Sequence, residues 1–185
     1  IAGERIAVAM KVIGDVHYIR ESGSKTPLKK GHIFETGDVL ITEKNGFAAL
    51  IYIDDKTALK VQENSELIIS GKRSAQAIAK DIRLKGGTLR AQVNKQKKRG
   101  FTIRTSVSVA SVKGTDFWLI SNKSGDSLIG LEGVVTLSNI ISGESLDITS
   151  GKSGISTSDG NVQSFKTDPK TIPVDPSDNA TGSQK

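Results

Sequence analysis

Basic side chains gather in one window of the sequence, from Lys72 to Arg99. Ten lysines and arginines stand there against one acid, Asp81, so the window carries a formal charge of +9 while the whole chain carries +6. A dense group of cations raises the local concentration of anionic partners. The window therefore predicts a binding site for a polyanion or an acidic partner. The residues expected to form this site are Lys72, Arg73, Lys95, Lys97, Lys98 and Arg99.

Three roles remain open for these cations. The compact run from Lys95 to Arg99 suits an acidic polymer of a cell envelope, such as an acidic glycan. Nucleic acid is disfavoured, because residues 72–99 contain no aromatic side chain on which a base could stack. The third role is structural, since a solvated lysine-rich loop keeps a protein soluble and discourages pairing at exposed strand edges.

The chain lacks most of the residues that catalysis and metal binding require. It has no cysteine, which excludes disulfides, thiolate nucleophiles and cysteine-ligated zinc. Its two histidines, His17 and His32, have no partner at the spacing of a metal site. No spacing among its glutamates, such as Glu35 and Glu132, favours a glycosidase pair. We therefore expect a protein that is not an enzyme, with no catalytic residue, no metal and no cofactor.

Two short motifs that could pass for ligand loops are better explained as turns. Asp54-Asp55 lacks the closely spaced oxygen ligands of a calcium loop, so we interpret these residues as turn residues that accept backbone hydrogen bonds. Lys113-Gly114-Thr115 lacks the first glycine of a phosphate-binding loop and the helix that should follow it. This motif is predicted to join two strands.

The elements that must position these residues are predicted to be strands. Hydrophobic residues make up 36% of the chain, and 19 glycines are spaced along it. Branched aliphatic side chains fit a pleated sheet, and glycines supply the positive φ angles of tight turns. We predict an all-β fold of many short strands in a twisted solenoid-like or sandwich arrangement. At most one short helix is expected.

Individual segments make this prediction specific. Ala48–Ile53 is apolar on both faces, which indicates a strand deep in a sheet. Gly86-Gly87 lies between two strand-like runs and predicts a hairpin. Phe101–Val109 has the clearest alternation of apolar and polar residues and predicts one strand. Ser74–Leu84 is the segment in which a single helical turn competes with a strand.

The chain is expected to divide into an all-β domain, residues 1–165, and a flexible tail or linker, residues 166–185. The tail holds three of the four prolines and few apolar residues. Such a segment buries too little surface to offset its ordering entropy. No apolar run approaches the roughly 18 residues that span a bilayer. Because the chain begins at Ile1, we expect a processed product from which a signal peptide, anchor or upstream domain was removed.

Three ordered stretches together resemble the FecR domain family. The first includes Gly37-Asp38-Val39-Leu40-Ile41-Thr42 and Asn45-Gly46-Phe47-Ala48, the second surrounds Gly86-Gly87-Thr88-Leu89, and the third runs from Phe101 to Phe117, with Gly133-Val134-Val135 after it. Two turns depart from the family pattern. Asp54-Asp55 stands where Asp-Gly is usual, and Ser106 stands where a proline is common. Both departures leave the alternation of the strands unchanged.

The resemblance implies an extracytoplasmic, all-β, non-enzymatic module of the bacterial cell envelope that works by binding an envelope protein or an acidic polymer. In iron-responsive regulators of this family, the corresponding domain lies in the periplasm and meets the signalling domain of an outer-membrane transporter. The resemblance therefore leaves an alternative open, in which the chain is the periplasmic sensor part of a transmembrane anti-sigma regulator.

Overall fold

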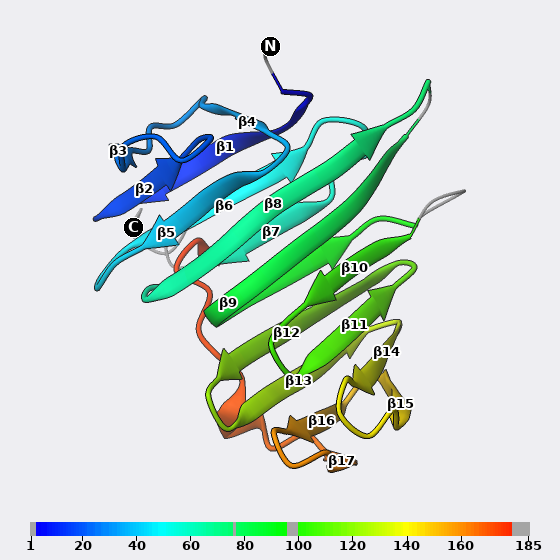
Figure 1. Ribbon diagram of the computed structural model, residues 1–185. Helices are drawn as coiled ribbons and strands as arrows, with labels where there is room; N and C mark the ends of the chain where they lie inside the picture. Colours follow the sequence, from blue (N-terminus) through cyan, green and yellow to red (C-terminus); the bar gives the residue numbers. More distant parts are fainter. Residues whose placement is uncertain (1–2, 76, 96–99, 179–185) are drawn as a thin grey trace, which may run out of the picture.

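The computed structural model describes residues 3–75, 77–95 and 100–178, which form a column of stacked strands (Figure 1). The first nine strands are β1 (Arg5–Ile13), β2 (Val16–Ile19), β3 (Thr26–Pro27), β4 (Ile33–Glu35), β5 (Asp38–Thr42), β6 (Phe47–Tyr52), β7 (Ala58–Val61), β8 (Ser65–Arg73) and β9 (Ile78–Val93). The others are β10 (Phe101–Arg104), β11 (Ser108–Val112), β12 (Thr115–Asn122), β13 (Gly125–Glu132), β14 (Val134–Asn139), β15 (Ser145–Thr149), β16 (Lys152–Thr157) and β17 (Val162–Lys166). Within these ranges, one short 3-10 turn, η1 (Pro169–Thr171), is the only helical element.

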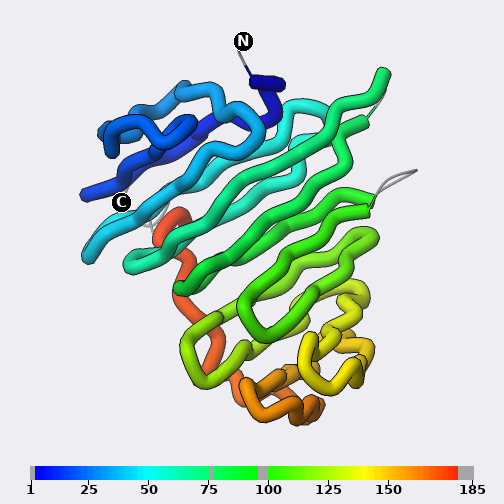
Figure 2. Tube along the Cα trace, viewed as in Figure 1, coloured from blue at the N-terminus to red at the C-terminus, as the bar shows by residue number. Residues whose placement is uncertain are grey.

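The strands lie in two sheets that share β9. Sheet A has the order β4-β1-β6-β7-β9-β12-β13-β16-β17. Sheet B has the order β3-β2-β5-β8-β9-β10-β11-β14-β15. Neighbours are antiparallel, except that β10 runs parallel to β9. The chain passes repeatedly from one sheet to the other as it descends the column (Figure 2), which confirms the all-β prediction and combines sandwich and solenoid features.

The core lies between the two sheets. Tyr52 on β6 of sheet A meets Phe101 on β10 of sheet B edge to face, with ring centroids 6.5 Å apart. The Tyr52 hydroxyl also donates a hydrogen bond of 3.2 Å to the carbonyl of Ser70 on sheet B. β6 pairs with β1 on one side and with β7 on the other, as predicted for a run that is apolar on both faces. Burial of these apolar side chains supplies most of the favourable free energy of folding.

β9 changes sheets at Gly86-Gly87, so the predicted hairpin at this pair is wrong. The residues before the pair are hydrogen-bonded to β8 and β10, whereas those after it are hydrogen-bonded to β7 and β12. Gly87 has φ +111°, and a Cβ atom there would lie 2.5 Å from the Cα atom of Ser65. The glycines therefore allow a sharp corner against a neighbouring strand, but they do not fold the chain back on itself.

The alternation from Phe101 to Val109 hides a turn, so the prediction of a single strand is wrong there. β10 ends at Arg104, and β11 begins at Ser108 and pairs back onto β10. The hydroxyl of Thr105 accepts hydrogen bonds from the backbone N–H groups of Val107 and Ser108, at 3.1 and 2.9 Å. Such local side-chain bonds compete with the strand ladder and stabilise a turn.

Two other expectations concern a possible helical turn in Ser74–Leu84 and the residues from Lys166 onward. The segment Ser74–Leu84 contains no helix among its described residues, because β9 begins at Ile78 and pairs with β8 over its whole first half. The flexible tail is expected from Lys166, and the structure describes residues 166–178 of it. These residues finish β17, form η1 and pass back onto sheet A, where Asp175 makes buried ion pairs. Residues 179–185 lie outside the described ranges.

Candidate functional site

The structure places Lys72, Arg73 and Lys95 on the same side of the column. Lys72 and Arg73 are the last two residues of β8, and Lys95 follows the end of β9 by two residues. Because β9 turns its corner at Gly86-Gly87, its two ends return to one side of the molecule (Figure 1). The other predicted site residues, Lys97, Lys98 and Arg99, lie outside the described residues.

A shared turn shows how close the two ends of β9 are. The backbone N–H of Ile78, at the start of β9, donates a hydrogen bond of 2.9 Å to Asp54. The amide group of Asn94, just past the end of β9, donates to the carbonyl of Asp55. The backbone N–H of Thr57 donates to the Asp55 carboxylate at 2.9 Å, as expected for a turn. Asp54 and Asp55 are therefore acids of a turn that separates the basic residues.

Two other cations of the basic window, Lys80 and Arg90, do not join them. Lys80 is fully buried, and its ammonium group donates to Asp54 and Asp55, at 2.9 and 3.1 Å. Arg90 lies in the half of β9 that belongs to sheet A and makes a two-bond contact with Asp116, at 2.9 and 2.8 Å. Successive side chains of a strand point to opposite faces, and β9 changes sheets at Gly86-Gly87. Cations that are close in the sequence therefore lie on different surfaces.

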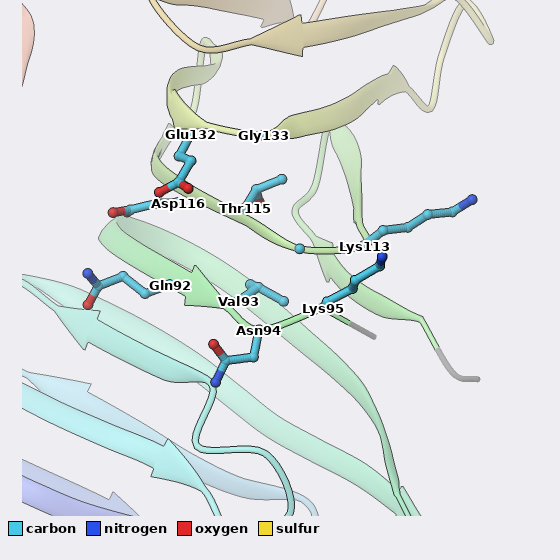
Figure 3. A pocket seen from close by; sticks show the side chains of 10 residues that line it. Gln92, Val93, Asn94, Lys95, Lys113, Thr115, Asp116, Glu132 and Gly133 are labelled. Atoms are coloured by element: carbon cyan, nitrogen blue, oxygen red, sulfur yellow. The ribbon is translucent and has the colours of Figure 1, made fainter. Parts of the chain in front are cut away.

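An open cleft lies beside Lys95, where the end of β9 meets two crossings of the chain between the sheets (Figure 3). Its volume is about 580 Å³. Lys95 and Lys113 stand on one side of the cleft, and Asp116 and Glu132 stand on the other. Gly114 belongs to the crossing from β11 to β12, which confirms that this motif joins two strands. The cleft therefore presents both signs of charge to solvent.

The two histidines take part in local packing. Nδ1 of His17 lies 3.1 Å from the carboxylate of Asp15, at the start of β2. The ring of His32 lies against that of Tyr18, with centroids 4.0 Å apart, and against the edge of Phe34. Burial, together with the nearby charge of Arg20, lowers the pKa of His32. Over the described part of the chain, no group of three or more His, Cys, Asp and Glu residues could hold a metal ion.

The structure reveals one charged site that the sequence did not indicate, on the outer face of sheet A. The carboxylate of Asp175 lies 2.6 Å from Nζ of Lys60 on β7 and 3.2 Å from Nη1 of Arg90 on β9. The Asp175 side chain is only 2% exposed. The guanidinium of Arg90 also lies over the ring of Trp118 on β12, 5.9 Å from its centroid. We call Lys60, Arg90 and Trp118 the outer groove.

The contacts in the outer groove shift the pKa values of Asp175 and Arg90. Burial alone would raise the pKa of Asp175, but hydrogen bonds from Lys60 and Ser177 outweigh burial and hold the pKa below its usual value. The hydrogen bond to Asp116, which outweighs partial burial, raises the pKa of Arg90. Sequence alternation places Lys60 on an outer face, but nothing in the sequence shows that an acid 115 residues away covers it.

Solved structures provide a likeness in fold. Two crystal structures of a candidate anti-sigma factor from Parabacteroides distasonis superpose with TM-scores of 0.60 and 0.58, at 11% and 12% sequence identity. Each alignment covers 71% of this chain and 61% of the other chain, so this chain spans about three fifths of the length of those proteins. No curated protein matches this sequence. Within the described residues, no helix is long and apolar enough to cross a membrane.

A family model provides the assignment. The model of the FecR protein family matches residues 38–136, which is just over half of the chain. The match begins at the first residue of β5 and ends within β14, so it contains the corner of β9 and the cleft beside Lys95. The resemblance seen in the sequence is thus confirmed, and this chain belongs to the FecR protein family.

Proposed function

We propose that this chain is an extracytoplasmic, non-catalytic recognition module that binds a protein of the bacterial cell envelope as part of a regulatory system. The observation that carries the proposal is the FecR family match over β5–β14, the centre of the two-sheet column. A module of this kind acts by binding, so its surfaces and edges matter more than any enclosed site.

The surface of the column favours a protein partner over a small molecule. Pockets for small ligands bury most of the ligand and are lined mainly by apolar groups. The cleft beside Lys95 is open instead, and charged side chains stand on two sides of it. At the last edge of sheet A, β17 pairs with β16 alone among the described strands, and Phe165 on it is 43% exposed. An exposed edge can accept an extended segment of another protein by strand addition.

Site-specific photo-crosslinking on the whole chain tests this proposal. A photoreactive residue at Gln163 on β17 should capture an envelope protein, whereas one at Lys30, in the connection from β3 to β4, serves as the matched exposed control. The captured protein is then purified and titrated with the unmodified chain by calorimetry. Saturable binding with fixed stoichiometry supports the proposal. Failure of every captured protein to bind in purified form, or substrate turnover by the chain, would contradict it.

The basic side of the column supports a second candidate, an acidic polymer. Lys95 and Lys113 both line the cleft, and Lys72 and Arg73 lie on the same side of the column. A labelled acidic glycan should stay bound at about 0.15 M salt, where weak surface attraction is screened. Replacing Lys95, Lys97, Lys98 and Arg99 with alanine should abolish that retention, and the control pair Lys29→Ala and Lys30→Ala should not. Equal retention would remove this candidate.

The family match and the fold likeness also support the alternative that the chain is the periplasmic sensor part of a transmembrane anti-sigma regulator. Under this alternative, deleting its gene in the source organism changes transcription of the genes that depend on one sigma factor. A transcriptome without such a set would contradict the alternative and would leave protein binding itself untouched.

A further inference from the structure

We propose that the outer groove of Lys60, Arg90 and Trp118 recognises an extended, proline-flanked acidic peptide of a partner protein. Asp175 of the chain occupies the groove when that partner is absent. This inference rests on the proposed function, because it names the surface and the partner chemistry of a protein-binding module.

The groove holds a carboxylate from two directions. One carboxylate oxygen of Asp175 contacts both the ammonium group of Lys60, at 2.6 Å, and the guanidinium of Arg90, at 3.2 Å. The other oxygen accepts a hydrogen bond of 2.8 Å from the backbone N–H of Ser177. Charge-assisted contacts of this kind are among the strongest hydrogen bonds in proteins and favour an anionic group such as a carboxylate.

Lys60 depends on Asp175 more than Arg90 does. Arg90 is paired with Asp116 through two hydrogen bonds and also lies 3.9 Å from Asp178. The charge of Lys60 is compensated by Asp175, and the Lys60 side chain is only 17% exposed. If Asp175 leaves, the partly buried ammonium group of Lys60 loses this carboxylate, which is unfavourable. An acidic side chain from another protein would restore the balance.

The conformation of the occupying segment defines the shape of the partner. Prolines at positions 173 and 176 flank Val174 and Asp175. A proline fixes its own φ angle and forces the residue before it into an extended conformation. The side-chain amide of Gln62, the residue that follows β7, donates a hydrogen bond of 2.5 Å to the carbonyl of Val174. The groove therefore accepts an extended backbone together with the acid, and little entropy is lost when such a preordered segment binds.

Trp118 indicates that the groove has an apolar floor. Its side chain is 1% exposed, yet it is not part of the core cluster between the sheets. It pairs across the strands with Arg90 on one side and Ile129 on the other, and Ile129 is also buried outside that cluster. Burial on an outer face requires a cover, and Asp175, which contacts Arg90, brings its segment onto this face. An apolar floor with cationic walls suits a segment such as Val-Asp-Pro.

The chain's own segment acts as a competitor at high effective concentration. A tethered segment is present at roughly millimolar effective concentration, so it reduces the apparent affinity of a partner without any change in the groove. A partner peptide must therefore bind more weakly to the wild-type chain than to a chain whose Asp175 is removed. This difference distinguishes competition for one groove from binding elsewhere.

The test uses the full chain and a synthetic peptide with the sequence of residues 170–178. Trp118 is the only tryptophan, so its fluorescence reports the cover of the groove. Asp175→Ala should shift the emission to the red, and the peptide should reverse this shift with saturation. A peptide with asparagine in place of Asp175, and with Asp178 retained, should bind at least about 10-fold more weakly. The wild-type chain should also bind the aspartate peptide at least about 10-fold more weakly than the Asp175→Ala chain.

Controls keep the result decisive. Asp168→Ala removes another acid of the same segment and should leave the emission unchanged, because Asp168 only caps η1. Asp175→Asn, which preserves the side-chain volume, is the second variant should Asp175→Ala fail to fold. Unchanged emission in both Asp175 variants, absence of peptide binding, or equal binding of the two peptides would overturn the inference. If an envelope partner nevertheless binds the wild-type chain and its Lys60→Ala variant equally, the proposed function stands without the groove.

Discussion

The carboxylate of Asp175 lies 2.6 Å from Nζ of Lys60, although 115 residues separate the two in the sequence. This contact brings the end of the described chain back to its first third and covers an outer face of sheet A. Together with the contact between Asp175 and Arg90, this ion pair holds the covering segment on that face. The change of Trp118 emission with pH is the most direct way to observe this ion pair.

Acid should release the segment that covers the groove. The pKa of Asp175 is lowered in the folded chain, despite burial, by hydrogen bonds from Lys60 and Ser177. The stabilisation is therefore complete above the unfolded value of about 3.9 and is lost as the pH falls through the lower, native value. Trp118 emission followed from pH 7 to pH 2 should shift to the red only below about pH 4.

The Asp175→Asn variant should show the red-shifted emission already at pH 7 and no further step at low pH. Asp116 and Asp178 also lie near Arg90, at 2.8 and 3.9 Å, so Asp168→Asn is the control that retains all three acids of the groove. A wild-type transition centred above pH 5 would show that another group controls the cover.

Removing the buried ammonium group of Lys80 should destabilise the fold. Lys80→Ala leaves the carboxylates of Asp54 and Asp55 without the cation that compensates them, and breaking a buried pair in this way costs about 3–5 kcal/mol. Urea unfolding followed by circular dichroism measures the loss. Lys85→Ala, which removes an exposed lysine 3.6 Å from Glu66, should change stability by no more than about 0.5 kcal/mol. Equal losses in the two variants would refute the role given to Lys80.

The corner of β9 should not tolerate a side chain. Gly87→Ala places a Cβ atom 2.1 Å from the hydroxyl oxygen of Ser65 at a positive φ angle, and should cost about 2–4 kcal/mol. Gly143→Ala also has a positive φ angle, but its Cβ atom has no neighbour within 4 Å, so it should cost only about 1–2 kcal/mol. Thermal unfolding of both variants measures the difference, and a smaller loss for Gly87→Ala would contradict the steric explanation.

The guanidinium of Arg20 should resist replacement by lysine. It donates to both oxygens of the buried Asp38, at 3.0 and 2.8 Å, and to the carbonyl of Ile33, at 3.0 Å. A lysine cannot reproduce this fork, so Arg20→Lys should cost about 1–2 kcal/mol. Arg104→Lys alters an exposed contact of 3.5 Å with Asp81 and should cost less than about 0.5 kcal/mol. Chemical denaturation that ranks the two variants in the opposite order would disprove this.

The sequence alone determined the class of fold and the family. Alternation of branched aliphatic residues and regularly placed glycines specify strands and turns locally, because side-chain direction in a strand repeats every two residues. The inner position of β6 followed from the same local pattern. The prediction of a single strand failed at Thr105, where the alternation of apolar and polar residues continues through a turn. That turn depends on a side-chain hydrogen bond and not on hydrophobicity.

Only the tertiary structure decided which charges meet. Cations that are adjacent in the sequence separate at the corner of β9, so Lys80 is buried while Arg90 faces outward. Asp175, in a segment too polar to predict any order, becomes a buried anion because Lys60 and Arg90 are already fixed on sheet A. Charges interact through distance in space, and in a protein built from long-range strand pairs that distance is set by the packing of the sheets.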